Sequence, residues 1–219
     1  MIDAYVWTTP NGYKALIALE ELELPYTIHW VDIRAGAQHK PEYLAINPNN
    51  KIPAIIDHEG EGGKTIQVFE SGAVLVYLGD KAGRLMPAGG AERITTLEWL
   101  FWGAGGIGPM GGQLGYWNLF APEKNPAAIE RFVAECKRLV SVLDRRLDES
   151  KFLGGSEYSV ADIMSFTWTR ATSHFGIDMQ QYANVRRWLD EIEARPAVQR
   201  ALAINPPGVE PFKLPPSSR

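Results

Sequence analysis

The spacing of apolar residues changes along the chain, from a mixture of strand and helix patterns to helix patterns alone. In the first part, short apolar runs typical of β-strands alternate with stretches of helical period. The predicted strands cover residues 2–7, 26–31, 53–57 and 65–69. One helix is predicted to begin at Pro10 after a capping Thr9, and another directly after the last strand, with Ser71 as its capping residue. The resulting order is β-α-β, a loop, and β-β-α.

A segment rich in glycine and proline, residues 82–90, is typical of a linker. Beyond it, every periodic stretch has the spacing of a helix. A long helix is predicted to start at Asn125 and Pro126, and its apolar stripe includes Cys136. Ser159-Val-Ala-Asp162 matches the capping box that opens a helix.

A last helix is predicted over residues 182–195, ending at Pro196. The tail after Asn205 is rich in proline, so we expect it to be extended and to add no helix. Together these patterns predict two domains: a mixed α/β domain over residues 1–81 and an all-helical domain over residues 91–219.

Residues 99–121 carry no charge and are long enough to cross a bilayer, and Gly103 to Gly108 formally match a dinucleotide-binding fingerprint. However, many glycines, with Pro109, Gln113 and Asn118, make the segment a poor membrane helix, and no βαβ unit frames the fingerprint. We therefore predict a buried helix with close backbone contacts, interrupted by glycine and proline.

The net charge of −4, with no long basic run, gives no electrostatic support for nucleic-acid binding. The first residues lack the charged and apolar regions of a secretory signal. A single cysteine excludes an intrachain disulfide and fits a reducing compartment, so a cytoplasmic protein is expected. The four histidines are scattered without metal-ligand spacing, and no metal site is predicted.

Two places carry candidate chemistry. The helix start at Ser71 offers free backbone N–H groups to a small anion. The backbone at Ile52 could pair with an extended peptide. A short acidic peptide is therefore the expected ligand. At the first helix start, Thr9 and Asn11 can each donate a hydrogen bond to a thiolate, which the helix N-terminus also favours. The alternative interpretation is a plain hairpin with a capped helix at Ser71, and an ordinary N-cap and turn at Thr9 and Asn11.

The stretches Lys51-Ile-Pro-Ala-Ile-Ile-Asp57 and Phe69-Glu-Ser-Gly72 resemble the glutathione site in the thioredoxin-fold half of glutathione transferases. The two-part plan resembles that family over nearly the whole chain. Its motif Thr9-Pro-Asn-Gly12, with Trp99-Leu-Phe-Trp102 and Ala128-Ile-Glu-Arg131, is similar to the bacterial Nu class. The resemblance implies a cytosolic glutathione transferase fold, with a thioredoxin-like N-terminal domain, an all-α C-terminal domain and a cis Ile52–Pro53 bond.

The same resemblance implies a glutathione-dependent disulfide-bond reductase in which Thr9 and Asn11 contact sulfur. It further implies that glutathione is contacted by Gln38, Lys51, Ile52, Glu70, Ser71 and Arg131. In that class the arginine comes from the partner subunit, which implies a homodimer. Since no cysteine lies near Thr9, the attacking thiolate must come from glutathione, and two glutathiones or one oxidised glutathione are the implied ligands.

Two other functions fit the same residues. One is the conjugation of glutathione to electrophiles, or a glutathione lyase activity. The other is a regulatory binding protein that has kept the fold, as in a fungal nitrogen regulator related to this class. The second substrate stays open, because its pocket would be built from Tyr116, Trp117 and the proline-rich tail, and these, like Tyr13, depart from the pattern of the class.

Overall fold

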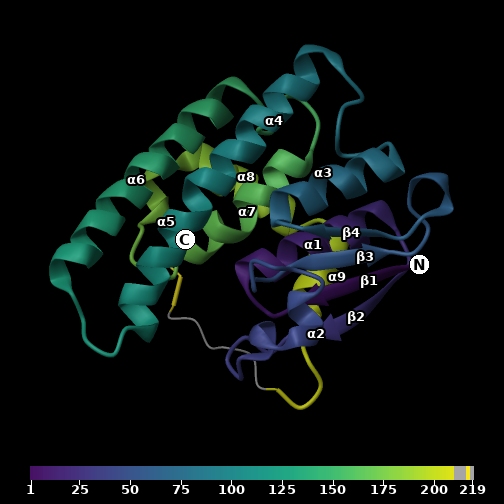
Figure 1. Ribbon diagram of the computed structural model, residues 1–219. Coiled ribbons are helices and arrows are strands. Elements are labelled where there is room, and N and C mark those ends of the chain that lie inside the picture. The colour runs from purple at the N-terminus through teal and green to yellow at the C-terminus, as the bar shows by residue number, and fades with distance from the viewer. Residues whose placement is uncertain (210–215, 218–219) are drawn as a thin grey trace. The chain divides into compact units, whose positions relative to one another are not determined.

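The computed structural model describes residues 1–209 and 216–217 (Figure 1). The contacts divide the described chain into two compact units. The first contains residues 1–88 and 195–209, and the second contains residues 89–194 and 216–217.

The first unit is built on one mixed sheet of four strands. The strands are β1 (Ile2–Val6), β2 (Tyr26–Trp30), β3 (Ala54–Asp57) and β4 (Ile66–Phe69), and their order across the sheet is β2-β1-β3-β4. Strand β1 is parallel to β2 and antiparallel to β3, and β4 is antiparallel to β3. The four predicted strands are confirmed, each with one end shifted by one residue. The order of elements is that of a thioredoxin-like domain.

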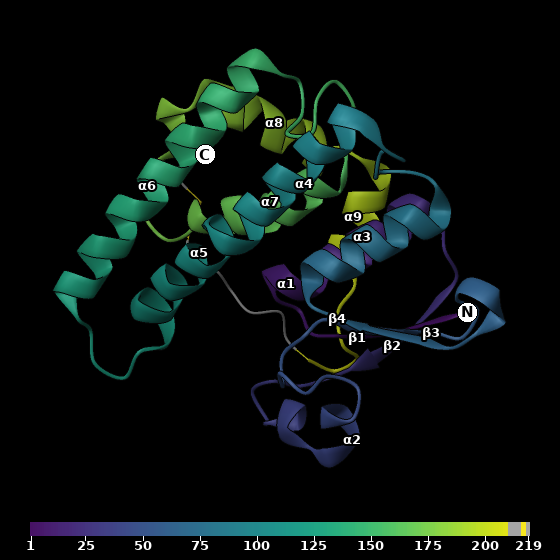
Figure 2. The same cartoon turned by 45° about the horizontal axis from the view of Figure 1, so that its top comes forward.

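Helices cover both faces of this sheet (Figure 2). On one face lie α1 (Pro10–Leu22) and α3 (Ser71–Ala82), which pack against each other. On the other lies the short α2 (Pro41–Leu44), whose Tyr43 joins an apolar cluster with Trp7 and Ile52. Between β2 and α2 the chain makes a single turn of 3₁₀-helix, η1 (Ala37–His39), and another such turn, η2 (Glu61–Gly63), joins β3 to β4.

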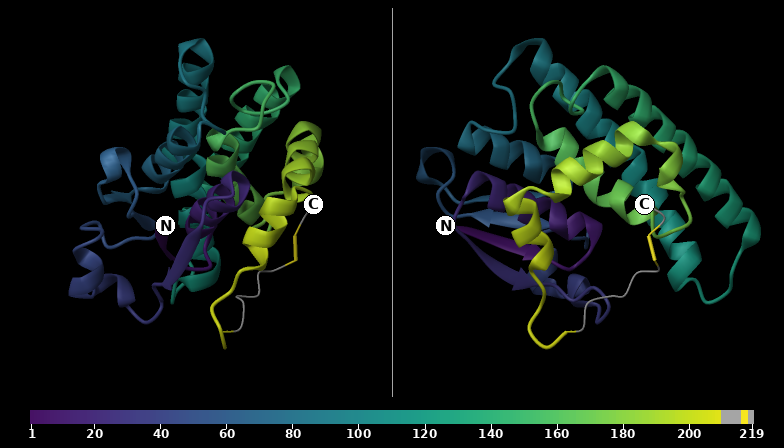
Figure 3. Two further views of the ribbon diagram at one scale, coloured as in Figure 1. Left: turned by 90° about the vertical axis from the view of Figure 1, so that its right-hand side faces the viewer. Right: turned by 180° about the vertical axis from the view of Figure 1, so that it is seen from behind.

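The expectation that no helix follows residue 195 is wrong. Helix α9 (Pro196–Ala203) packs on α1, and Figure 3 shows it in yellow beside the purple helix. Pro196 begins this helix instead of only ending the previous one, because the first helical position needs no N–H donor. Two ion pairs join it to α1: Arg195 to Glu21 at 2.6 Å and Arg200 to Glu20 at 2.7 Å. The remaining prediction for the tail falls largely on residues 210–215 and 218–219, outside the described residues.

The second unit is helical throughout its described part. Its elements are α4 (Gly90–Gly105), α5 (Ile107–Gly115), a π-helical turn η3 (Tyr116–Phe120), α6 (Pro126–Glu149), α7 (Val160–Thr172), a 3₁₀ turn η4 (Met179–Gln181) and α8 (Ala183–Glu193). Helix α7 is buried along almost its whole length and packs against α4, α5 and α8. The helices predicted from Asn125 and from the capping box are confirmed.

The uncharged segment 99–121 forms the end of α4, all of α5 and η3, so it is helical and interrupted, as predicted. It is not buried throughout, because Phe101 is 67% exposed and Phe120 is 59% exposed. A side chain at Gly103 would lie 2.8 Å from the Met164 side chain, and one at Gly111 would lie 3.1 Å from the Trp168 ring. Glycine is thus what lets α4 and α5 approach α7 closely. Among the described residues, no helix is both long and apolar enough to cross a membrane.

Candidate glutathione site

The site begins where β1 meets α1. The Thr9 hydroxyl oxygen accepts the Gly12 N–H at 3.2 Å, so Thr9 is the N-cap of α1 as predicted, and Pro10 is the first helical residue. A Cβ atom at position 12 would lie 2.0 Å from the Trp7 carbonyl oxygen. Only glycine fits this approach, which explains the last residue of Thr-Pro-Asn-Gly. Because the Thr9 oxygen serves as acceptor within the helix, its O–H remains able to donate outward.

Asn11, in the first turn of α1, is held from inside the domain. The Lys14 ammonium donates a hydrogen bond to Asn11 Oδ1 at 2.9 Å. Lys14 is only 2% exposed, and this burial lowers its pKa to about 7, while the charge of Glu70 acts in the opposite direction. The burial of this lysine beside a predicted catalytic asparagine is a structural feature that the sequence patterns did not reveal.

The wall of the site is the loop that leads into β3. The Lys51 carbonyl accepts two hydrogen bonds, one from the Tyr43 hydroxyl and one from Asn47 Nδ2 at 2.6 Å. Burial raises the pKa of Tyr43 to about 12, so its hydroxyl stays protonated and donates. The Ile52–Pro53 bond is cis, as the resemblance implied. Among the described residues, neither the backbone N–H nor the C=O of Ile52 makes a hydrogen bond, so both can pair with a ligand.

The third part is the start of α3, and here one detail of the prediction is wrong. The N-cap is Glu70, with φ of +69°, and Ser71 is already the first helical residue. The reason is that Glu70 carries the sharp turn out of β4, so the helix begins one residue earlier than predicted. Among the described residues, neither the hydroxyl nor the N–H of Ser71 has a hydrogen-bond partner. Glu70 accepts a bond from Asn49 Nδ2 at 3.0 Å, which orients its carboxylate.

These three segments meet in one small pocket of about 100 Å³. Its lining residues are Asn11, Asn47, Asn49, Lys51, Ile52, Pro53, Glu70 and Ser71. Five of the predicted site residues are therefore neighbours in space. The prediction missed Asn47 and Asn49, although their spacing was a usable signal: the Asn49 N–H donates to Asn47 Oδ1 at 2.9 Å, as in an Asx turn.

Three predicted residues are not among those that line this pocket. Thr9 lies beside it at the same helix start as Asn11. Gln38 lies on η1, where its amide is 3.2 Å from the His39 ring.

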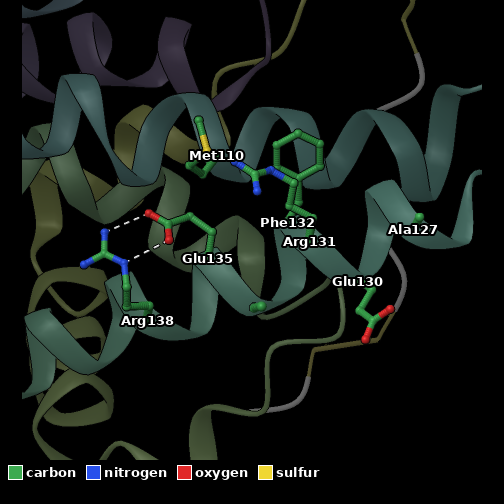
Figure 4. A pocket seen from close by; sticks show the side chains of 8 residues that line it. Met110, Ala127, Glu130, Arg131, Phe132, Glu135 and Arg138 are labelled. Atoms are coloured by element: carbon green, nitrogen blue, oxygen red, sulfur yellow. Dashed lines mark hydrogen bonds and ion pairs between the residues drawn. The ribbon is translucent and has the colours of Figure 1, made fainter.

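Arg131 lies on α6 of the second unit. It lines an open cavity of about 730 Å³ with Met110, Phe132 and the Glu135–Arg138 ion pair (Figure 4).

The pocket presents a carboxylate, an uncapped helix start and a free strand-like backbone within one small volume. Glu70 suits an ammonium group, and the N–H and O–H of Ser71 suit a carboxylate, with added attraction from the positive end of α3. The Ile52 backbone suits a peptide group. Together these groups match an extended peptide that ends in a free amino acid moiety, which is the chemistry of a γ-glutamyl peptide such as glutathione.

The single cysteine belongs to the second unit and is not among the residues that line this pocket. Cys136 is fully buried on α6, as its position on the apolar stripe predicted. Burial raises the pKa of its thiol to about 12, so it stays protonated. In the described part of the chain, no group of three or more His, Cys, Asp or Glu side chains is placed to hold a metal ion.

Fold and site together define a thioredoxin-like peptide-binding domain joined to a helical domain. Two protein-family models match the chain: glutathione S-transferase, N-terminal domain, over residues 8–81, and glutathione S-transferase, C-terminal domain, over residues 109–196. The chain belongs to the glutathione S-transferase family.

One similar relative is the disulfide-bond oxidoreductase YfcG of Escherichia coli, with 48% identity over 92% of this chain and 94% of the relative. A glutathione transferase from Burkholderia graminis, solved with two glutathione molecules per subunit, has 44% identity and a TM-score of 0.88, covering 92% of this chain and 87% of that one. A glutathione transferase from Pseudomonas putida, solved with one glutathione disulfide per subunit, has 42% identity and a TM-score of 0.88, covering 94% and 92%.

Proposed function

We propose that this protein is a glutathione-dependent disulfide-bond reductase that binds two glutathione molecules, or one oxidised glutathione, at the pocket of the first unit. The observation that carries the proposal is the site itself. A small pocket lies at a helix start whose Thr9 hydroxyl and Asn11 amide carry hydrogen-bond donors. The protein's own cysteine is buried in the second unit, and its raised pKa keeps it protonated. The names of the similar relative and the ligands of the similar structures support the same reaction.

Each group has a role in binding glutathione. Glu70 pairs with the γ-glutamyl ammonium, Ser71 binds the γ-glutamyl carboxylate through its hydroxyl and N–H, and Ile52 pairs with the cysteinyl backbone. Lys51 and Gln38 lie further along the peptide, toward its glycine carboxylate. The Thr9 hydroxyl and the Asn11 amide donate to the thiolate, which lowers the cost of its ionisation.

The reaction is thiol–disulfide exchange in two steps. The thiolate of one glutathione attacks a sulfur of the substrate disulfide; an S–S bond forms to glutathione, and the other substrate sulfur leaves as a thiolate that takes up a proton. The second glutathione then attacks the glutathione sulfur of this mixed disulfide. Oxidised glutathione forms and the second substrate thiol is released. Two glutathiones are oxidised and one disulfide is reduced, without a protein thiol.

The proposal extends to assembly and location. The protein is a homodimer of the Nu class in the cytoplasm, in which Arg131 reaches the glutathione site of the other subunit. Supporting this, Arg131 lines an open cavity on α6, where a ligand or a second chain can be received. Light scattering at micromolar concentration tests the dimer, and a monomer would contradict it. Arg131→Ala should weaken glutathione binding in the dimer without dissociating it.

The test of the reaction compares two assays on the purified protein: reduction of a small disulfide by glutathione, and conjugation of glutathione to a model electrophile. Disulfide reduction should be much the faster. Cys136→Ser, provided it folds, should keep nearly all reductase activity, whereas Thr9→Ala should lose about tenfold, or about 1.4 kcal/mol, because one donor to the thiolate is gone. Faster conjugation would favour a transferase, and no activity with intact glutathione binding would favour a regulatory protein.

A further inference from the structure

Lys14 stands out among the lysines of the described chain. It sits in the second turn of α1, with Ala15, Leu16 and Ile17 buried next to it, and its own exposed fraction is 2%. A long charged side chain is almost never buried to this extent unless it is paired. Yet no described carboxylate lies within ion-pair distance, and its hydrogen-bond partner is the neutral amide oxygen of Asn11, at 2.9 Å.

This contact favours one of the two orientations of the Asn11 amide. In its protonated form Lys14 has three donors and no acceptor, so it pairs with the amide oxygen, as in the 2.9 Å contact to Oδ1, and not with the nitrogen. The amide is planar, and its oxygen and nitrogen are bonded to the same carbon at an angle of about 120°, so they face different directions. With Oδ1 held toward Lys14, inside the domain, the NH₂ group points away from it. Asn11 itself lines the pocket together with Ile52, Glu70 and Ser71.

We infer that Lys14 is a positioning residue, which holds the Asn11 amide with its NH₂ group toward the glutathione sulfur. Without Lys14 the Asn11 amide could rotate by about 180° and present Oδ1 to the thiolate. The partial negative charge of Oδ1 would then face the negative sulfur. The positive charge of Lys14, buried behind Asn11, also favours the anion. This inference rests on the proposed function, since it assigns a role in ionising the bound thiol.

A purely structural role for Lys14 would predict a different effect of its replacement on stability. Burying a lysine without an ion pair costs stability, so a buried apolar residue of similar length should be tolerated or even preferred. Lys14, whose burial lowers stability, thus contacts the predicted site residue Asn11. Such a combination is expected where a residue serves function at a cost in stability.

The experiment is a double-mutant cycle with Lys14→Met and Asn11→Ala, measured as the reductase rate and as the pKa of the bound glutathione thiol, followed by the ultraviolet absorbance of the thiolate. Lys14→Met should lower kcat about five- to tenfold with little change in KM, raise the thiol pKa by up to about one unit, and leave the melting temperature unchanged or higher. When Asn11 is already alanine, Lys14→Met should lower kcat and raise the thiol pKa by at most about half as much, because only the effect of the lost charge remains.

Two variants control the cycle. Lys81→Met removes a positive charge from the same unit, where Lys81 pairs with Asp57 and not with Asn11, and it should leave both readouts unchanged. Lys14→Gln keeps an N–H donor without the charge and should recover part of the lost rate; if Lys14→Met does not fold, Lys14→Gln takes its place in the cycle.

Equal losses from Lys14→Met in both Asn11 backgrounds, or no loss in either, would overturn the inference. If the wild-type protein binds glutathione but reduces no disulfide, the proposed function fails while the thiol pKa still tests Lys14.

Discussion

The buried carboxylate of Asp162 allows a quantitative prediction for the second unit. Asp162 is fully buried at the start of α7 and accepts four hydrogen bonds. Oδ1 accepts the Leu153 N–H and the Trp188 indole N–H, each at 2.9 Å, and Oδ2 accepts the N–H and the hydroxyl of Ser159, each at 3.0 Å. One carboxylate thus joins the loop before α7, the cap of α7 and the core of α8.

Asp162→Ala removes the acceptor of all four donors at once. The Ser159 hydroxyl can rotate to another partner, but three N–H groups remain, at about 1–3 kcal/mol each when left buried and unpaired. Relief from burying a charge offsets part of this, since burial raises the pKa of Asp162 to about 6. A net loss of about 3–5 kcal/mol is expected. Asp162→Asn keeps an oxygen for Leu153 and Trp188 and loses only the acceptor facing Ser159, so about half of that loss is expected.

The pH dependence has a definite sign. The folded protein holds a proton on Asp162 up to about pH 6, whereas the unfolded chain releases it near pH 4. In this window the folded state binds more protons, so this group's contribution to stability falls as pH rises. An asparagine at position 162 binds no proton in this pH range, so it makes no pH-dependent contribution to stability. The destabilisation by Asp162→Asn should therefore be larger at pH 5 than at pH 7, by about 1 kcal/mol.

The assay is urea unfolding followed by tryptophan fluorescence, which includes the emission of Trp188. Asp178→Ala is the matched control, because Asp178 caps the turn η4 through the Gln180 N–H at 2.9 Å and has no buried partners. It should cost about 1 kcal/mol or less. The reasoning is refuted if Asp162→Ala costs no more than Asp178→Ala, or if Asn and Ala at position 162 are equally destabilising at both pH values.

The remaining predictions concern the first unit. Gly12→Ala should lower the melting temperature and the glutathione affinity together, because its Cβ would overlap the Trp7 carbonyl and displace the start of α1; an unchanged affinity by calorimetry would contradict the close approach. Ser71→Ala should weaken glutathione binding by about 1 kcal/mol without abolishing it, since the backbone N–H remains, and equal affinity would exclude a hydroxyl contact. Wild-type stability should rise between pH 7 and 10, because the unfolded chain keeps a proton that Lys14 loses when folded, and Lys14→Met should lack this rise.

Local signals in the sequence predicted much of the architecture. Helix starts such as Thr9-Pro10 and the Ser159–Asp162 capping box are set by hydrogen bonds within one turn, so a short stretch of sequence is enough to identify them. The change of period after residue 81 predicted the two kinds of fold. The glycines of segment 99–121 predicted closely packed helices. In the first unit, the resemblance to a family supplied the peptide site and the cis bond at Ile52.

Other features were decided only by the tertiary structure, because they depend on residues far apart in the chain. Ser71 is not the cap of α3, since the turn at Glu70 is set by how β4 leaves the sheet. Helix α9 joins the first unit through Arg195 and Glu21, a contact that no local pattern encodes. Lys14 looks like an ordinary surface lysine until packing encloses it behind Asn11. Periodicity determines which segments form helices and strands, but the electrostatics of a site depend on what packing places beside each charge.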